Sequence, residues 1–391
     1  MKMKTLLRSS LLLACLMVLA GCGVTSEAII PMTGAVVSKQ ETVRVAVKVK
    51  AASANISIPG PGSYYDQTSG VFIGRFAKVQ NAVFSSRNGL VAINGQVGQG
   101  KKAAKRIMFI PEEGQLVDID GVKYRGQVEL LANGSELTVV NHVGLEEYLC
   151  GVVPKETFAS WPSEALKAQA IVSRSYTIAK REAMKGKDFD LQAPLDQLYG
   201  GASAEAPSTT AAVYETAGSY LEFEGKPLLT FFHTCCGGAT EDGEKIFSNV
   251  KTYPAGHASP FCKSCKHYSW EYTIPMTTMA SKLKAAGFDA GSARSFKILK
   301  RFGSERVAQI SFGDGSKSVT LTGEQLRKAV GYDVIKSTKF YLDVKNGSYI
   351  FRGNGWGHGV GLCQWCTKTM AEQGWTSQQM VEFFYKGAKL R

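Results

Sequence analysis

The spacing of the apolar residues changes along this chain of 391 residues, and that change limits the folds open to it. In residues 41–50, ETVRVAVKVK, four valines alternate with other residues, which is the pattern of a half-buried strand. From there to residue 141, short apolar runs are broken by Gly, Asn and Pro, as in LVAINGQV (90–97) and SELTVVN (135–141). Residues 41–141 are therefore predicted to be β-rich with tight turns.

Helical patterns appear beyond this region. Residues 162–182 contain no Gly and are rich in Ala, Leu, Gln and Ile, and Pro162 suits the first turn of a helix. A second helix is predicted over 208–217. Two more are predicted to start at Thr322 and Thr376, because each threonine is followed three residues later by a Gln, the spacing of a capping box.

Strand patterns persist between these helices. The segments 220–223 and 227–232 flank a Glu-Gly-Lys turn and predict a hairpin, and further strands are predicted over 306–312 and 347–352. The whole chain is therefore assigned to the α+β class, with a β-rich N-terminal part packed against a mixed α/β part over 142–391.

The first 22 residues have the features of an export signal. Three basic residues precede an apolar stretch, 11–20, that is too short to span a bilayer. The stretch ends in Leu19-Ala20-Gly21-Cys22, which resembles the lipobox of bacterial lipoproteins, in which the cysteine is lipidated. An ordinary secretory signal is the alternative. We expect an exported protein, anchored in the membrane through Cys22 and facing the periplasm or cell wall, with 23–40 as a tether.

The net positive charge favours an anionic binding partner. The net charge is +13, and removal of the three basic residues of the signal leaves +10. An exported protein of this charge is suited to an anionic polymer or membrane surface. Nucleic acid is not expected as a partner, because basic residues do not alternate with aromatic ones in a repeat. No second apolar run is long enough to span a membrane.

Glu156 is the leading candidate for chemistry. The sequence GVVPKETFASWPSEALKAQA (151–170) places it in a turn between an apolar, strand-like run and a helix, and Pro154 is expected to keep Val153 extended. A carboxylate held between apolar elements is costly unless it is paired or functional. The alternative is an acid that caps the following helix.

Other polar residues lie in patterns that suit a binding cleft. Arg174 shares a helix face with apolar residues, so it is either in a structural ion pair or orients a loop or substrate. Gln197 and Tyr199 lie in the loop APLDQLYGG, and Asp196 beside them is a candidate second acid. His233 and His358 lie in two Gly-rich turns, where glycines let a ligand or backbone approach closely.

Seven cysteines remain after Cys15 and Cys22 are set aside. Two C-x-x-C pairs, 262–265 and 363–366, accompany the adjacent Cys235 and Cys236. Such pairs can bind zinc, and disulfides compete outside the cytoplasm, so both states remain open. Cys150 lies in an apolar run and is expected to be simply buried.

Together these motifs resemble the SpoIID/LytB family, named for the stage II sporulation protein D and the amidase enhancer. The likeness is closest over LEEYLCGVVPKETFASWPSEALKAQAIVSRSYTIA (145–179). It continues through DQLYGG (196–201), FFHTCCGGATED (231–242) and GWGHGVGLCQW (355–365). It covers nearly all of the chain beyond the tether.

The resemblance implies that peptidoglycan is the substrate and that the activity is that of a lytic transglycosylase on glycan strands stripped of stem peptides. It implies that Glu156, in V-V-P-x-E, is the catalytic acid. The substrate-binding residues that go with it are Arg174, Gln197, Tyr199, His233, His358 and Gln364. It also implies that one neighbourhood contains Cys236, Cys262, Cys265 and Cys363.

This chain departs from the family pattern at three places. Thr157 stands where Met is common, and Cys366-Thr367 replaces the usual Gly-Ala. The stretch 191–196, with Leu191, Gln192 and Asp196, lacks the two cysteines that form an apparent zinc pair in some members.

The expected reaction uses one carboxylate and needs no cofactor, so any zinc would be structural. The alternative function is that of a wall-binding lipoprotein that stimulates a separate amidase. A third candidate function, that of a zinc-dependent amidase, has less support, because the sequence has no compact ligand set such as H-E-x-x-H.

Cys22→Ala tests the anchor. Without a cysteine to lipidate, the protein should leave the membrane fraction or remain unprocessed, as cell fractionation and gel mobility would reveal. A variant that fractionates and migrates like the parent would show that Cys22 is not the anchor.

Overall fold

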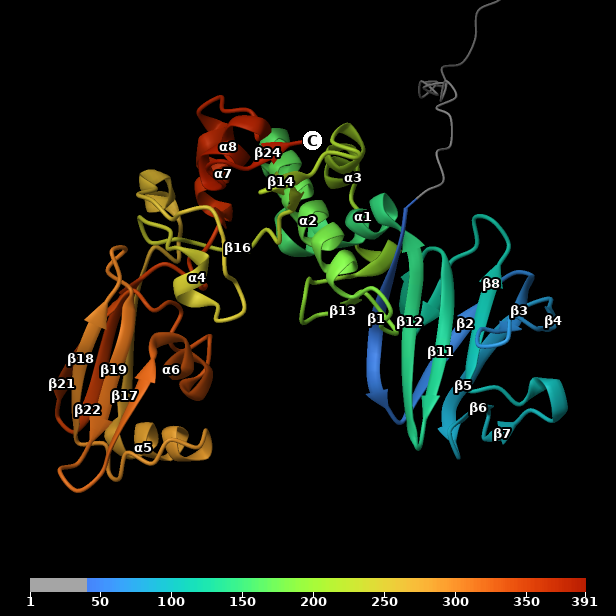
Figure 1. Cartoon of the computed structure of the whole chain (residues 1–391), viewed down its shortest axis with the longest axis horizontal. Helices are drawn as coiled ribbons and strands as arrows, with labels where there is room; N and C mark the ends of the chain where they lie inside the picture. Colours follow the sequence, from blue (N-terminus) through green and yellow to red (C-terminus); the bar gives the residue numbers. More distant parts are fainter. Residues whose placement is uncertain (1–40) are drawn as a thin grey trace, which may run out of the picture. The chain divides into compact units, whose positions relative to one another are not determined.

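The computed structural model describes residues 41–391 (Figure 1), so the predicted signal, Cys22 and tether lie outside the described residues. N-terminal β-sheets are followed by helices and smaller sheets, which confirms the predicted α+β class. Within 41–391, no helix is both long enough and apolar enough to cross a membrane.

The β-rich part consists of two sheets. Their strands are β1 Thr42–Ala51, β2 Ser53–Ile58, β3 Gly62–Asp66, β4 Phe72–Phe76, β5 Val79–Arg87, β6 Leu90–Ile93, β7 Gln96–Val97, β8 Arg106–Pro111, β9 Val117–Ile119, β10 Val122–Tyr124, β11 Gln127–Asn133 and β12 Glu136–Gly144, with a short 3₁₀ turn at Gly100–Lys102. One sheet has the order β13-β1-β12-β11-β8-β3-β4, where β13 is Leu191–Gln192, and the other has the order β10-β9-β2-β5-β6-β7. Buried residues of both sheets, such as Ile56 of β2 and Leu130 of β11, share one core.

The alternating valines form β1 as predicted. Val43 and Val45 are fully buried, whereas Val47 and Val49 are only half-buried. The register of β1 against β12 shifts between Ala46 and Lys48, so the alternation does not continue to the end of the strand.

Helices follow the β-rich part. They are α1 Leu145–Glu156, α2 Ser163–Ala183, α3 Pro207–Glu215, α4 Gly243–Ile246, α5 Met276–Ala285, α6 Gly323–Val330, α7 Gln364–Glu372 and α8 Ser377–Phe384, with 3₁₀ turns at Gly201–Ala204 (η2) and Pro260–Ser264 (η3). The capping boxes predicted at Thr322 and Thr376 are both present, with Gln325 and Gln379 as their reciprocal partners.

The prediction of a strand before Glu156 is wrong, because residues 145–156 form α1. Two acids in its first turn, Glu146 and Glu147, favour a helix, and seven of its residues are buried. Pro154 removes one backbone donor, but only two residues follow it, so the helix ends before the break matters. Val153 is therefore helical and not extended.

The remaining strands form small sheets. They are β14 Leu221–Phe223, β15 Lys226–Pro227, β16 Phe232–His233, β17 Ser269–Pro275, β18 Ser295–Arg301, β19 Val307–Gly313, β20 Ser318–Thr322, β21 Phe340–Lys345, β22 Ser348–Asn354, β23 Leu362–Cys363 and β24 Lys389–Leu390. The predicted hairpin is shorter than expected, because only β14 and β15 pair there. The short parallel pair β16–β23 places His233 opposite Cys363.

Helix α2 contributes residues to two hydrophobic cores. Its Ala170 packs with α1 and with Val43 and Val45 of β1. Its Ile171 and Val172 belong to a second core that also contains α7, α8 and six cysteines. The helix that follows Glu156 in sequence is therefore buried on two sides.

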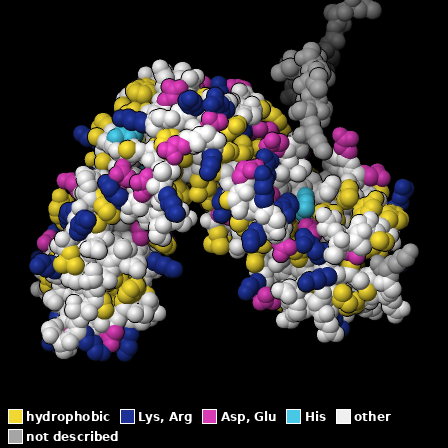
Figure 2. Space-filling model, in the orientation of Figure 1, with side chains coloured by type: hydrophobic (Ala, Val, Ile, Leu, Met, Phe, Trp, Pro, Cys, Tyr) yellow, Lys and Arg dark blue, Asp and Glu magenta, His cyan; other side chains and the backbone are white. Residues whose placement is uncertain are grey.

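Charged side chains are distributed over the surface. Figure 2 shows Lys and Arg interspersed with Asp and Glu on the visible face. The positive net charge is thus not gathered into one patch on that face.

A close approach at Gly151 fixes the loop that faces the end of α1. A Cβ at this position would lie 2.7 Å from the Tyr199 ring and 2.8 Å from the carbonyl oxygen of Gly201. The Gly200 N–H donates to the Gly151 carbonyl at 3.0 Å. Only glycine lets the 196–201 loop lie directly on the helix backbone.

Gly151→Ala should therefore destabilise the fold. Alanine normally favours a helix, but here the methyl group overpacks the loop, and we expect a net loss of about 1–3 kcal/mol in the free energy of unfolding. Urea denaturation measures it. Gly303→Ala is the control, because no atom lies within 4 Å of a Cβ there. A Gly151→Ala midpoint at or above that of the parent would contradict the packing argument.

Candidate functional site

Glu156 is the last residue of α1. Helix α2 begins at Ser163, so Glu156 does not cap it, and the capping alternative does not apply. The carboxylate instead lies at the negative end of the α1 dipole, which disfavours its charged form. Thr157, where the family commonly has Met, ends the helix through bonds from its N–H (3.0 Å) and Oγ1 (2.8 Å) to the Val153 carbonyl.

The carboxyl group of Glu156 is half-buried, and no cationic side chain within residues 41–391 forms an ion pair with it. Oε1 accepts one hydrogen bond, from the Leu198 N–H at 2.7 Å. Burial raises the pKa of Glu156 to about 7, and the Leu198 N–H only partly offsets this. No Lys, Arg or His within residues 41–391 contributes to that shift. The group can therefore exist in both protonation states near neutral pH, as the apolar flanks suggested.

Gln364, the first residue of α7, connects that helix to Glu156. Its Nε2 lies 2.9 Å from the backbone carbonyl of Glu156 and 3.3 Å from Oε1 of Gln169. Gln169 in turn donates to Ser173 Oγ at 3.1 Å. The buried polar residues of α2 thus continue a chain of amides and hydroxyls that supports the end of α1.

Aromatic residues lie beside this end of α1. Phe158 packs on Trp161 with ring centroids 5.6 Å apart, and Trp161 meets Trp365 edge-on at 5.8 Å. Phe158 is 56% exposed, and Leu198, whose N–H contacts Glu156, is 41% exposed. We call Phe158, Trp161 and Trp365 the aromatic strip. Such faces are suited to packing against the apolar faces of sugars.

Arg174 is a structural residue. Its side chain is fully buried, and its Nη2 and Nε lie 2.6 and 2.9 Å from the two carboxylate oxygens of Glu146. Its remaining bonds go to backbone carbonyls of Val213 and Ser219 and to Thr216. The structure favours the ion-pair interpretation over substrate binding, because every guanidinium nitrogen donates to the protein.

Gln197 and Tyr199 also make internal contacts. Gln197 Oε1 accepts from Tyr148 and Thr177 at 3.1 and 3.0 Å. The Tyr199 hydroxyl donates to Asn141 at 2.8 Å. These bonds position the loop whose intervening residue, Leu198, contacts Glu156.

Asp196, the candidate second acid, is held by other groups. Tyr176 donates to it at 3.0 Å, the Gln192 N–H at 2.8 Å, and Lys180 pairs with it at 2.9 Å. It supports the loop, and it makes no hydrogen bond with Glu156.

His233 and His358 form a pair of their own. Their rings are 5.5 Å apart, and the rings of Phe231 and Phe247 lie at 6.0 and 5.1 Å from His358. Burial, together with the neighbouring His233, Arg327 and Arg306, holds the pKa of His358 well below its usual range. His233 is buried and its Nδ1 lies 3.1 Å from the Val360 carbonyl. The pair lies beside the cysteines, and it has no hydrogen bond to Glu156.

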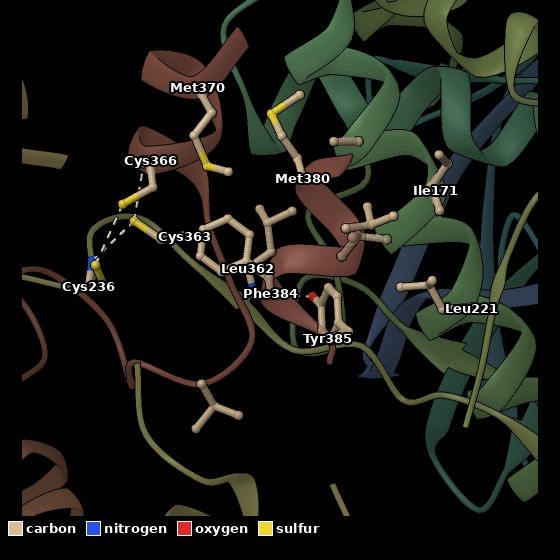
Figure 3. Packing of buried hydrophobic residues seen from close by; sticks show 14 of the residues in the cluster. Ile171, Leu221, Cys236, Leu362, Cys363, Cys366, Met370, Met380, Phe384 and Tyr385 are labelled. Atoms are coloured by element: carbon tan, nitrogen blue, oxygen red, sulfur yellow. Dashed lines mark hydrogen bonds between the residues drawn. The ribbon is translucent and has the colours of Figure 1, made fainter. Parts of the chain in front are cut away.

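Four buried thiols converge, and Figure 3 shows three of them, Cys236, Cys363 and Cys366. The ligand atoms of Cys236, Cys262, Cys363 and Cys366 all lie within 4.8 Å of one another, so this thiol tetrad could hold a structural zinc. The family resemblance implied Cys265 in place of Cys366. Cys366 joins because it lies one helical turn after Cys363 at the start of α7, whereas the Cys265 thiol lies beside Cys235.

The larger cavities lie away from Glu156. One of about 560 Å³ includes Trp375 and Phe383, one of about 550 Å³ includes Ile58 and Gln115, and one of about 430 Å³ includes Arg352.

Sequence reasoning missed several residues of the site. Glu146, the partner of Arg174, was one of two acids in an otherwise apolar segment, and that pattern could have suggested a buried ion pair. Phe158 and Trp161 lie in the short loop between α1 and α2, and Trp365 lies in α7, so no periodic pattern joins the three. The Leu198 N–H is a backbone group, so no side-chain pattern could have indicated it.

Comparisons with known proteins add to this geometry. Residues 133–223 match a family model described as SpoIID, stage II sporulation protein. Over these residues the chain is homologous to the SpoIID family. The matched segment contains Glu156, Arg174 and the 196–201 loop. Residues 248–361 match a second model, described as a domain of unknown function (DUF8618).

SpoIID-related proteins occur among the similar sequences. An uncharacterised protein of Brachyspira hyodysenteriae is 27% identical over 357 residues, which are 90% of this chain and 94% of that protein. Stage II sporulation protein D of Bacillus subtilis is 28% identical over 267 residues, 64% of this chain and 75% of that protein. The amidase enhancer of Bacillus subtilis is 25% identical over 293 residues, 62% of this chain and 40% of that protein.

The raised pKa of Glu156 predicts a pH-dependent effect of Glu156→Gln on stability. The protonated carboxyl stabilises the parent fully below pH 4.5, and this contribution is lost as the pH rises through about 7. Relative to the parent, the Tm of Glu156→Gln should therefore increase between pH 5 and pH 8. Glu113→Gln, at an exposed position, should show no such trend. A Tm difference for Glu156→Gln that stays flat with pH would show that Glu156 titrates like a solvated acid.

Proposed function

We propose that this protein is a peptidoglycan lytic transglycosylase in which Glu156 acts first as acid and then as base. The observation that carries the proposal is the half-buried Glu156 carboxyl, whose pKa is raised to about 7 without a cationic partner. A general acid works best when its pKa is close to the working pH. Homology to the SpoIID family supports the same assignment, because V-V-P-x-E is the motif that the family resemblance ties to the acid.

The first step is proton donation. Oε1 of Glu156 accepts a hydrogen bond from the Leu198 N–H, so the proton to be donated is on Oε2. It protonates the glycosidic oxygen between N-acetylmuramic acid and N-acetylglucosamine, and the bond from that oxygen to C1 of the muramoyl sugar breaks. The departing N-acetylglucosamine keeps the proton as a hydroxyl.

The second step returns the proton to the enzyme. The C6 hydroxyl of the muramoyl sugar attacks its own C1, and Glu156, now ionised, takes the hydroxyl proton. A 1,6-anhydro end forms without water and without a cofactor. Ordinary glycosidases need a second carboxylate to supply or activate the nucleophile. Here the nucleophile is intramolecular, which agrees with Asp196 being engaged by Lys180 and Tyr176.

The surface around Glu156 is suited to a glycan strand. The aromatic strip and the exposed Leu198 give apolar faces for sugar rings. We place the protein outside the cytoplasm, anchored through Cys22, where peptidoglycan is found. Its net positive charge is compatible with that anionic polymer.

A second function is favoured by one observation, the similarity to a protein named amidase enhancer. In this alternative the chain binds glycan strands and stimulates a separate cell-wall amidase without cutting them. Glu156 would then contribute to binding or to local structure.

Glu156→Gln separates the two functions. The purified protein, without any amidase, is incubated with denuded glycan strands, and mass spectrometry detects anhydro-muramic ends. The parent should produce them. Glu156→Gln should bind strands equally in a sedimentation assay but lose about 10²–10⁴-fold in rate, because glutamine cannot donate the proton. The parent rate should fall as the pH rises above 7, since the acid is then ionised.

Glu113→Gln should cut at the parental rate. Absence of anhydro products from the parent itself, together with stimulation of an added amidase, would favour the enhancer function. A Glu156→Gln variant that cuts as fast as the parent would refute the role of Glu156.

A further inference from the structure

The thiol tetrad has the dimensions of a metal site. The Sγ atom of Cys236 lies 3.4 Å from that of Cys262 and 3.6 Å from that of Cys366. Four thiolates around one tetrahedral zinc ion, with Zn–S distances of about 2.3 Å, place their sulfurs about 3.8 Å apart. All four side chains are fully buried, and none of the seven cysteines in residues 41–391 is in a disulfide.

We propose that Cys236, Cys262, Cys363 and Cys366 bind one structural Zn²⁺. Binding releases the four thiol protons and leaves a centre with a net charge of −2. Four soft thiolates in a closed tetrahedral set select zinc for structure and leave no open position for catalysis.

Groups around the tetrad are arranged to support thiolates. The backbone N–H groups of Cys236 and Cys366 donate to Cys363 Sγ at 3.2 and 3.4 Å. The buried Ser259 hydroxyl donates to Cys366 Sγ at 3.2 Å. Cys363 is the N-cap of α7, so both cysteines of the C-x-x-C pair lie at the positive end of that helix. Donors of this kind orient metal-bound sulfurs and disperse their charge.

A buried arginine provides a second, independent observation. Arg306 is fully buried, and its Nη2 donates to the Cys236 carbonyl at 2.7 Å. Its Nε and Nη1 are buried with no hydrogen-bond partner among the described residues. Gly359 leaves room for the guanidinium, because a Cβ there would lie 2.2 Å from Arg306 Cζ.

Within residues 41–391, Arg306 forms no ion pair with a carboxylate. Glu241 is one of the acids that attract it, but its oxygens accept from Ser304 at 2.6 Å and Lys245 at 3.1 Å. A buried cation without a counter-charge is strongly destabilising. A zinc–thiolate centre of net charge −2, at the residue whose carbonyl Arg306 contacts, supplies that counter-charge.

The ion would connect three segments that are far apart in the sequence. Cys236 follows β16, Cys262 is in η3, and the remaining pair opens α7. Gln364 and Trp365 lie between the two ligands of that pair. Gln364 contacts the Glu156 carbonyl and Trp365 meets Trp161, so zinc would also hold one wall of the candidate site. Only this last consequence depends on the proposed function.

Metal analysis of the purified full chain, without a histidine tag, tests the proposal. We expect elemental mass spectrometry to find about one zinc ion per chain. Titration of the thiols with a mercurial should release the zinc in proportion to the thiols that react. Intact-protein mass distinguishes the competing states. Loss of two hydrogens per cysteine pair without zinc would establish disulfides, and metal-free thiols or bound iron would equally overturn the proposal.

Cys366→Ser and Cys265→Ser form the matched pair of variants. Both remove a buried thiol from the same neighbourhood, but only Cys366 belongs to the tetrad. Cys366→Ser should lose most of the zinc and have a lower Tm, whereas Cys265→Ser should keep the parental zinc content. The reverse result would overturn the assignment of the ligands. If Cys366→Ser does not fold, the zinc content of Cys265→Ser and the mercurial titration of the parent still decide the question.

Zinc content and activity are measured separately. A chain that binds zinc through the tetrad but forms no anhydro products would refute the proposed transglycosylase and leave the metal site intact. A chain that forms anhydro products but contains no zinc would refute the metal site and leave the proposed transglycosylase activity intact.

Discussion

The buried guanidinium of Arg174 determines where α1 lies. Its Nε and Nη2 hold the Glu146 carboxylate at the start of α1. Nη2 also donates to the Val213 carbonyl of α3, and Nη1 donates to the Ser219 carbonyl after that helix. An ion pair removed from water costs several kcal/mol per charge unless its geometry and hydrogen bonds are complete, as they are here. Removing either partner would leave an uncompensated charge in the core. The pair therefore fixes the start of α1, the helix that ends at Glu156.

Glu156 itself is held by backbone contacts. Gly151 lets the 196–201 loop lie against α1, and the loop presents the Leu198 N–H to the carboxyl group. One neutral donor orients the group but offsets only part of the effect of burial, so its pKa stays raised. The structure therefore has a fixed acid with a raised pKa, and it supplies no cation that would lower it. A residue serving only as a structural ion would be expected to have the opposite environment, which is that of Glu146.

The second core gives the site its other wall. Helix α2 separates the Glu146–Arg174 pair from the tetrad, with Ala170 on one core and Ile171 and Val172 on the other. The C-x-x-C pair of α7 places Gln364 against the end of α1. Cys366 and Arg306 thus affect the position of Glu156 through the elements packed between them, and neither residue contacts Glu156 directly.

The sequence by itself determined the α+β class, β1, α2, both capping boxes and Glu156 as the residue to test, because these follow from periodicity, local capping and a recognisable motif. It misjudged α1, since a Val-Val-Pro run has the local preferences of a strand, whereas the two acids of the first turn and the packing of the segment against β1 and α2 favour a helix. The tertiary structure alone decided that Arg174 is structural, that Cys366 joins the tetrad and that Leu198 faces Glu156. Each of these depends on contacts between residues distant in the chain, and side-chain spacing within one segment carries no information about such contacts.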